Sequence, residues 1–293
     1  MRCPLVAIVA LILVAGAENR LAAQPSASAP RSRVLFVGNS LTYVNDLPAM
    51  IEAVAAQAGL AGRITTRAVA LPDMGLEEHW NHGDALRAIQ QGGWTHVVLQ
   101  QGPSSLPESQ AILREFTKKF AFEIRRAGAR VVLYSVWPPR ARAAFFDAVT
   151  AGYAKAAADV RGILVPVGEG WRAAWRRDPS LQLYGPDGFH PSPAGTYLAA
   201  LMFVQALSGT RPVGLPAPQQ STDKTLKDLA LTTAQVKVLQ EAAADANAAA
   251  VRIAGREWRV GGLAVALTRG AAGQPPTGNR NWRLATGIAR RRR

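Results

Sequence analysis

One serine and a distant Asp-x-x-His pair have the residue types that nucleophilic catalysis requires. Ser40 ends the run Gly38-Asn39-Ser40, where a glycine lets a short hydroxyl project from the end of an apolar segment. Asp187 and His190 lie much later in the chain, separated by two residues. A serine hydroxyl is a poor nucleophile until a base removes its proton, and a carboxylate that fixes the tautomer of the base makes it more effective. Ser40, His190 and Asp187 supply these three roles.

The segment around His190 contains the signals of a turn followed by a helix. Pro186 and Gly188 favour a turn that brings Asp187 back toward the imidazole of His190. Ser192 then caps a helix whose first position is a proline. The competing interpretation is a helix-capping turn with an incidental histidine, and a serine after Gly-Asn is by itself only a weak signal.

The elements that must position these residues follow a repeating pattern of short apolar runs and helical segments. Helical signals occur after Asp46, which precedes an early proline, and in the two long segments 107–127 and 141–160. Continuous apolar strands separated by helices are typical of parallel βαβ units with both sheet faces covered. The pattern predicts an α/β domain of three layers, α/β/α, with about five parallel strands over residues 33–208. The β-branched runs are Val34–Val37, Ile64–Val69, Thr95–Gln100, Arg130–Val136 and Ile163–Val167.

The chain beyond this domain contains one more helical signal and then a basic segment. Thr232 and Gln235 form a possible capping box for a helix that packs back on the domain, which we expect to span residues 33–254. Residues 252–293 hold ten Arg and one Glu, so most of the formal charge of +14 lies there. Because a nucleic-acid groove would distribute Lys and Arg over the folded body, no specific nucleic-acid partner is expected. We predict a mobile tail over residues 255–293 that contacts polyanions or anionic surfaces.

The N-terminal residues have the pattern of a secretory signal. A charged start, an apolar run from Leu5 to Ala17 and small residues up to Ala23 predict a signal peptide over residues 1–23, followed by a linker over residues 24–32. The apolar run is shorter than the roughly 20 residues that span a bilayer, although a retained anchor is the alternative. The one cysteine, Cys3, lies in this segment, so disulfides, cysteine zinc sites and a thiol nucleophile are excluded for the mature protein. We expect a secreted or periplasmic protein.

Two blocks of the sequence resemble a known family. Residues 34–42, Val-Leu-Phe-Val-Gly-Asn-Ser-Leu-Thr, and residues 187–195, Asp-Gly-Phe-His-Pro-Ser-Pro-Ala-Gly, are similar to the first and last blocks of the SGNH hydrolases, also called GDSL-like esterases and lipases. Asn39 stands where the commonest pattern of the family has Asp. The resemblance implies a flavodoxin-like fold and the hydrolysis of acyl esters without a metal or an organic cofactor.

The resemblance also implies an oxyanion hole built from three donors. The family uses the amide of the nucleophile, here Ser40, a glycine amide after the second strand, and an Asn side chain after the third. Gly75 matches the glycine, within one or two residues of register. The usual Gly-x-Asn-Asp is absent, and the sequence has Gln100 and Gln101 instead, so Gln101, or failing that Gln100, is the expected third donor. The departure puts the efficiency of the reaction in doubt more than its type.

Three further residues are candidates for binding substrate. His79 and His82 are three apart in a segment with two carboxylates, so a metal site is possible there. Since no further ligand cluster is evident, we expect no metal and assign His79 to lining or supporting the cleft. Trp137 and Tyr184 lie at the same rim, where aromatic faces suit sugar rings as well as they suit simple packing.

Together these features predict an exported serine esterase. The preferred substrate, mostly by resemblance, is an acylated and in particular acetylated carbohydrate. The same machinery could pass the acyl group to a sugar hydroxyl, which would make the protein an acyltransferase. The alternative from another class is a non-catalytic carbohydrate-binding module on the same scaffold, for which the missing Asn is the only argument.

Overall fold

The computed structural model describes residues 31–255, 258–260 and 263–265. The predicted signal peptide, nearly all of the linker and most of the predicted tail lie outside these residues. The five strands form one parallel sheet in the order β2-β1-β3-β4-β5. Their positions confirm the predicted sheet of the α/β class, and their bounds are β1 Ser32–Gly38, β2 Ile64–Ala70, β3 His96–Leu99, β4 Arg130–Ser135 and β5 Ile163–Pro166.

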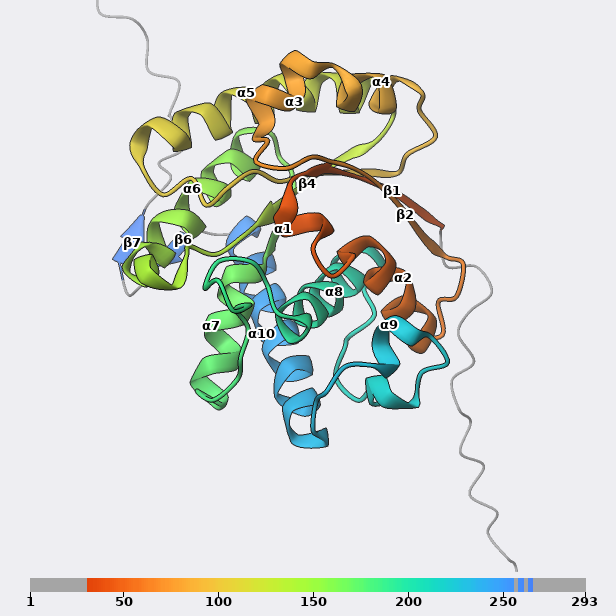
Figure 1. Ribbon diagram of the computed structural model, residues 1–293. Coiled ribbons are helices and arrows are strands. Elements are labelled where there is room, and N and C mark those ends of the chain that lie inside the picture. Colours follow the sequence, from red (N-terminus) through yellow and green to blue (C-terminus); the bar gives the residue numbers. More distant parts are fainter. Residues whose placement is uncertain (1–30, 256–257, 261–262, 266–293) are drawn as a thin grey trace, which may run out of the picture.

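Helices cover both faces of the sheet (Figure 1). One layer contains α3 (Leu76–His82), α4 (Asp84–Gln90), α5 (Pro107–Arg126) and α6 (Phe146–Asp159). The other contains α2 (Leu47–Gln57), α7 (Val167–Arg177), α8 (Pro193–Ser208) and α10 (Thr233–Gly255). Because β1 is covered on both sides, its four apolar residues Val34–Val37 are fully buried, which explains why they form a continuous run instead of an alternating one.

Two helices of this second layer, α2 and α8, begin directly after the predicted N-cap residues. The Asp46 carboxylate accepts a hydrogen bond from the amide of Ala49 at the start of α2. The Ser192 hydroxyl accepts one from the amide of Gly195 at the start of α8. Further along α8, Phe203 contacts Phe36 of β1 and Tyr134 of β4 edge-on, with ring centroids 5.2 Å apart in both pairs. The helix that begins beside His190 is therefore also a central part of the core.

The structure differs from the predicted helices in two segments. The helix expected over 141–160 begins as a 3-10 turn, η1 (Arg140–Phe145), and becomes α-helical only in α6. Helix α7 carried no sequence signal, because two glycines lower its helix propensity. One of them, Gly168, is required by packing, since a Cβ there would lie 2.6 Å from the main-chain carbonyl oxygen of Val136.

Short elements also occur where none were predicted. Between α8 and α10 the chain forms η2 (Pro218–Gln220) and α9 (Lys224–Lys227). Inside the predicted tail, β6 (Trp258–Val260) and β7 (Leu263–Val265) pair antiparallel, although no strand was predicted there. Within the described residues, no helix is long and apolar enough to cross a membrane.

Candidate active site

Ser40 is held at the junction of β1 and the four-residue helix α1 (Ser40–Tyr43). The side chain of Asn39 caps this helix, its Oδ1 accepting a hydrogen bond from the amide of Leu41 at 3.1 Å. Because α1 starts at Ser40, the amide of Ser40 has no acceptor one turn earlier, and none is found among the described residues. The nucleophile candidate therefore has a fixed backbone and one free N–H.

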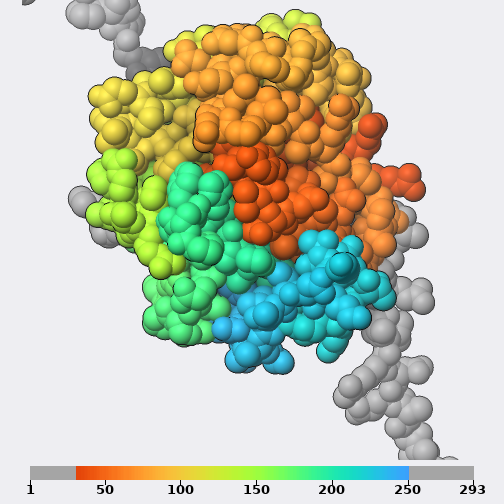
Figure 2. All heavy atoms as spheres, viewed as in Figure 1, coloured from red at the N-terminus to blue at the C-terminus, as the bar shows by residue number. Residues whose placement is uncertain are grey.

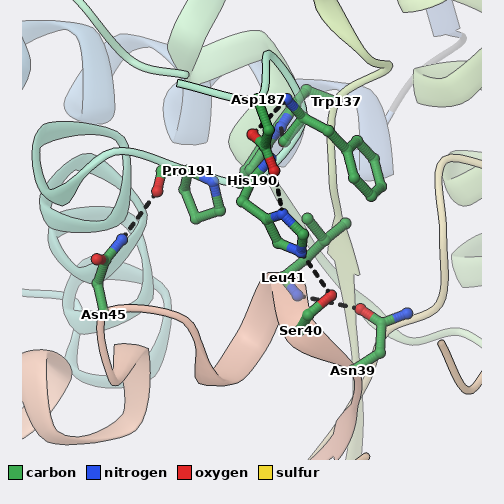
Figure 3. A network of polar contacts seen from close by, with 9 residues as sticks. Asn39, Ser40, Leu41, Asn45, Trp137, Asp187, His190 and Pro191 are labelled. Carbon is green, nitrogen blue, oxygen red and sulfur yellow. Dashed lines mark hydrogen bonds and ion pairs between the residues drawn. The ribbon is translucent and has the colours of Figure 1, made fainter. Parts of the chain in front are cut away.

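The structure brings Ser40, His190 and Asp187 together in one line of hydrogen bonds (Figure 3). His190 Nε2 lies 2.9 Å from the hydroxyl oxygen of Ser40, and His190 Nδ1 lies 2.5 Å from Oδ2 of Asp187. The carboxylate accepts the proton of Nδ1, which leaves Nε2 as the acceptor facing the serine. This is the geometry that a serine nucleophile and its base require.

Asp187 is kept ionised by the turn that contains it. Its Oδ1 accepts hydrogen bonds from the amides of Phe189 and His190, at 2.9 and 3.0 Å, while its Oδ2 faces the imidazole. The hydrogen bond to His190, followed by the backbone donor of Phe189, lowers the pKa of Asp187 from 3.8 to about 2. Gly188 has φ +68°, a left-handed conformation that explains the glycine in this turn.

The loop after β4 clamps this turn from outside. Trp137 Nε1 donates to the carbonyl of Phe189 at 2.9 Å, and the amide of Arg140 donates to that of Gly188 at 2.8 Å. The hydroxyl of Tyr184 donates to the carbonyl of Pro138 at 2.6 Å. Three donors thus join two segments that are far apart in sequence. On the surface, the segment around residue 190 (green) borders the red segment that contains Ser40 (Figure 2).

The predicted contact of aromatic side chains with substrate needs correction. Trp137 has no exposed surface and stacks on Trp171, with ring centroids 3.6 Å apart. Tyr184 is 6% exposed, and its hydroxyl already donates to the chain. Simple packing was the alternative left open for both residues. It is the arrangement of Trp137, while Tyr184 is packed but keeps a small exposed part that lines a depression beside His190. Their polar atoms hold the turn that carries His190.

Gln100 connects the end of β3 by hydrogen bonds to residues 39–42, the segment that contains Ser40. Its Oε1 accepts from the amide of Asn39 at 2.9 Å and from the Thr42 hydroxyl at 2.8 Å, while its Nε2 donates to Oδ1 of Asn39 and to the carbonyl of Gln101. The side chain is fully buried and uses all of its hydrogen-bonding groups. A Cβ at Gly38 would lie 2.4 Å from this Oε1, so the glycine makes room for the contact.

Three comparisons place the chain among known proteins. No family model matches the sequence, and no curated protein matches it. Among solved structures, a protein of Slackia heliotrinireducens assigned to the SGNH hydrolases is 29% identical, with a TM-score of 0.51, and the match covers 61% of this chain and 99% of that one. The two sequence blocks that resemble the SGNH hydrolases agree with this similarity. The chain belongs to the SGNH hydrolase superfamily.

Two other solved structures share the fold at lower identity. A DUF4886 family protein of Bacteroides uniformis is 17% identical with a TM-score of 0.60, over 74% of this chain and 94% of that one. The lipase/acylhydrolase of Enterococcus faecalis is 15% identical with a TM-score of 0.50, over 61% and 96%. The similarity to SGNH and GDSL-like hydrolases supports a general assignment of the chain as an ester hydrolase.

The SGNH pattern of oxyanion donors is only partly present in this structure. The amide of Gly75 donates to Oε2 of Glu78 at 2.9 Å, in the capping box of α3. Gln101 accepts from the amide of Leu76 through its Oε1 and donates to the Ser104 hydroxyl through its Nε2, at 3.2 and 2.7 Å. Both groups are therefore occupied, and Gln101 links two loops instead of pointing a free amide at Ser40. Gln100, the other candidate, is fully occupied as well.

This SGNH hydrolase has Asn39 where the commonest pattern of the family has Asp, and the structure gives a reason for the difference. Nδ2 of Asn39 donates to the carbonyl of Met74 at 3.0 Å, in the loop after β2. An aspartate could accept from Leu41 in the same way, but it has no proton to give to a carbonyl. Asn39 therefore connects the segment that contains Ser40 to the loop after β2, where the family has its glycine oxyanion donor.

His79 supports the site from beneath and does not line it. Its side chain is fully buried, its Nε2 lies 2.7 Å from the carbonyl of Gly38, and burial lowers its pKa. The predicted contact with substrate is therefore wrong, since the imidazole has no exposed surface, while the predicted supporting role fits. His82 pairs with Asp84 instead. Within the described part of the chain, no group of three or more His, Cys, Asp or Glu side chains could hold a metal ion.

The clamp of Trp137, Arg140 and Tyr184 was not found from the sequence. Its bonds run from side chains or amides to main-chain carbonyls, and any residue type supplies a carbonyl. No residue pattern marks the acceptor, so only the fold reveals the pairing. The Trp-Pro-Pro-Arg segment directly after a strand was the one available signal, because it placed an indole at the same rim as His190.

Proposed function

We propose that this protein is an exported serine esterase in which Ser40 is the nucleophile, His190 the base and Asp187 the orienting carboxylate. The observation that carries the proposal is the line of hydrogen bonds from Asp187 through His190 to Ser40. These residues come from two ends of the domain, so a local turn cannot account for their meeting. Export rests on the signal-like N-terminal pattern alone.

The proposed reaction has two halves with the same groups. His190 Nε2 takes the hydroxyl proton of Ser40 while the serine oxygen attacks the ester carbonyl. The imidazolium then gives this proton to the leaving alcohol, and an acyl-serine remains. In the second half His190 takes a proton from water, the hydroxide attacks the acyl-serine, and the proton returns to Ser40 as the acid leaves. Asp187 stays ionised throughout and stabilises the imidazolium.

The amide of Ser40 is the donor best placed for the oxyanion, because it is free and belongs to the nucleophile itself. The amide of Gly75 can join it once the exposed carboxylate of Glu78 moves away. Loss of one such donor costs on the order of 100-fold in rate, so the position of Glu78 affects turnover directly. For the substrate we propose an acetylated carbohydrate, on the resemblance to the family.

The test uses p-nitrophenyl acetate and a panel of acetylated sugars. We expect hydrolysis by the wild type and none by Ser40→Ala, with normal activity in Ser208→Ala, which alters an exposed serine at the far end of α8. A fluorophosphonate should label the wild type on the peptide that contains Ser40, as checked by mass spectrometry. Full activity in Ser40→Ala would overturn the nucleophile assignment. Acetyl transfer to an added sugar in place of water would point to a transferase.

A further inference from the structure

A depression with a mixed polar and apolar lining lies beside the proposed catalytic histidine, and the turn that carries this histidine forms part of its wall. Its volume of about 590 Å³ is sufficient for a sugar residue. It adjoins the proposed acyl site because His190 belongs to both. Its lining combines the polar side chains of Asn45, Arg140, Gln182, Asp187 and His190 with apolar groups, mainly three prolines and Val44. The small exposed part of Tyr184 also belongs to it.

Arg140 is the cation of this depression, and its position is fixed. Its amide donates to the carbonyl of Gly188, which fastens its backbone to the catalytic turn. Its guanidinium lies over the ring of Tyr184, 5.2 Å from the centroid. A guanidinium stacked on an aromatic face keeps its N–H groups at the edge of the plane, where they can bond to an incoming group.

The charges around the depression leave Arg140 without a counter-ion. No ion pair with Arg140 occurs among the described residues. Asp187 is the only acid that lines the depression, and its two oxygens already accept from His190 and two backbone amides. By contrast, Arg172 nearby in the fold is paired with both Asp147 and Glu169. The depression therefore presents an unpaired positive charge next to the reacting groups.

We propose that Arg140 binds an anionic group of the substrate, and that the preferred substrate is an acylated sugar which carries a carboxylate. This inference rests on the proposed esterase function and names its substrate class. The planar guanidinium fork matches a carboxylate through two parallel hydrogen bonds, which a lysine cannot form. Binding there holds the sugar beside His190 while its ester reaches Ser40.

The experiment compares matched acetylated glycosides that differ in one substituent. One carries a free carboxylate, the second the corresponding neutral carboxamide, and the third a sulfate ester on a neutral sugar. We expect the wild type to prefer the carboxylate over the carboxamide by roughly 5- to 10-fold in kcat/KM, mainly through KM. The preference should shrink as ionic strength rises, because the site is exposed.

Two substitutions of Arg140 separate charge from geometry. Arg140→Gln should reduce the ratio of carboxylate to carboxamide to about 1, and Arg140→Lys should restore only part of it. Arg142→Gln is the control, since Arg142 is an exposed arginine of the same η1 turn whose guanidinium lies over Phe145 and which does not line the depression. We expect the wild-type ratio in this control.

The possible outcomes distinguish this inference from the function on which it rests. If the wild type hydrolyses none of the esters, the proposed function fails. If it hydrolyses carboxylate and carboxamide equally, or if Arg140→Gln keeps the full preference, the esterase remains and the role of Arg140 is refuted. A stronger preference for the sulfate than for the carboxylate would overturn the carboxylate and leave an anion site.

Discussion

At the scale of single residues, the site depends on side-chain amides whose donors and acceptors are all used. Asn39 shows this best, because its side chain both caps α1 and donates to the loop after β2. Gln100 accepts from the amide of Asn39 and donates to its side chain. A substitution that keeps the shape of such a residue but changes one donor should therefore alter the reaction more than the fold.

Asn39→Asp tests this at the position where the family commonly has Asp. The introduced carboxylate would keep the cap on Leu41 and oppose the carbonyl of Met74, so we expect turnover to fall by about 10-fold. When protonated, the new carboxyl could donate to that carbonyl again. Activity relative to wild type should therefore fall as pH rises through the pKa of the new group. A flat ratio between pH 4 and 8 would contradict the role of the Met74 contact.

Asp187→Asn tests the orienting carboxylate. Because the pKa of Asp187 is lowered to about 2, the wild type retains this charge at every pH used in an assay. We expect kcat to fall by about three to four orders of magnitude in the variant, since the neutral amide cannot hold the same tautomer or stabilise the imidazolium. Stopped assays over pH 5–9 would measure it. Asp147→Asn, at a surface ion pair, is the matched control and should be active.

At the scale of elements, the loop after β4 and the turn before α8 act as one unit. The two segments exchange three hydrogen bonds through Trp137, Tyr184 and Arg140. Trp137 and Tyr184 were predicted as substrate contacts because the sequence placed aromatic residues at this rim. Their position beside the turn agrees with the structure, but their exposure does not. Exposure cannot be inferred from position alone, and here the stacked Trp171 covers the face of Trp137.

Trp137→Phe should loosen the turn while leaving the core nearly intact. The ring still stacks on Trp171, but the carbonyl of Phe189 loses its donor, so we expect kcat to drop by about 5- to 20-fold. Trp94→Phe is the matched control, because its indole also donates to a carbonyl, that of Ala88, away from the site. Steady-state kinetics and thermal melts of both variants would decide. Equal losses of kcat in the two would mean that the effect is general.

At the scale of the whole molecule, the fold was predictable and the finer site was not. Strands with helices on both faces must be apolar on both faces, and the sequence shows this directly as continuous apolar runs in β1 and β3. The hydroxyl of Ser40, the carboxylate of Asp187 and the imidazole of His190 likewise suggest their possible roles as nucleophile, orienting group and base from the sequence alone. The state of the oxyanion donors could not be predicted, because the hydrogen bonds of Gln101 and Gly75 depend on which loops meet, and no local pattern specifies that.

The stability of the molecule should depend on pH through its buried histidines. Burial lowers the pKa of His96 from 6.5 to about 4, and burial lowers that of His79 as well. A lowered pKa means that the unfolded chain binds the proton more tightly, so stability is complete above pH 6.5 and is lost as pH falls toward 4. For His96 we expect a loss on the order of 1–2 kcal/mol, after allowance for solvent screening.

Urea titrations at pH 4.5 and 7.5 would measure this difference in the wild type and in His96→Gln. The variant should be less stable at pH 7.5 and should show a smaller drop between the two values. His82→Gln is the control, since His82 is exposed and pairs with Asp84. An identical drop in His96→Gln and in the wild type would contradict the assignment.

The position of α8 in the sequence also determines the order in which the parts of the site form during folding. All five strands of the parallel sheet precede residue 167, and Ser40 comes near their start, whereas His190 follows much later, directly before α8. A growing chain thus contains its proposed nucleophile and every strand of the parallel sheet before it contains its proposed base. Because α8 also supplies Phe203 to the centre of the core, the docking of α8 on the sheet is the same event that delivers the proposed base. A chain in which α8 has not docked should therefore be inactive, and activity reports on that step of folding.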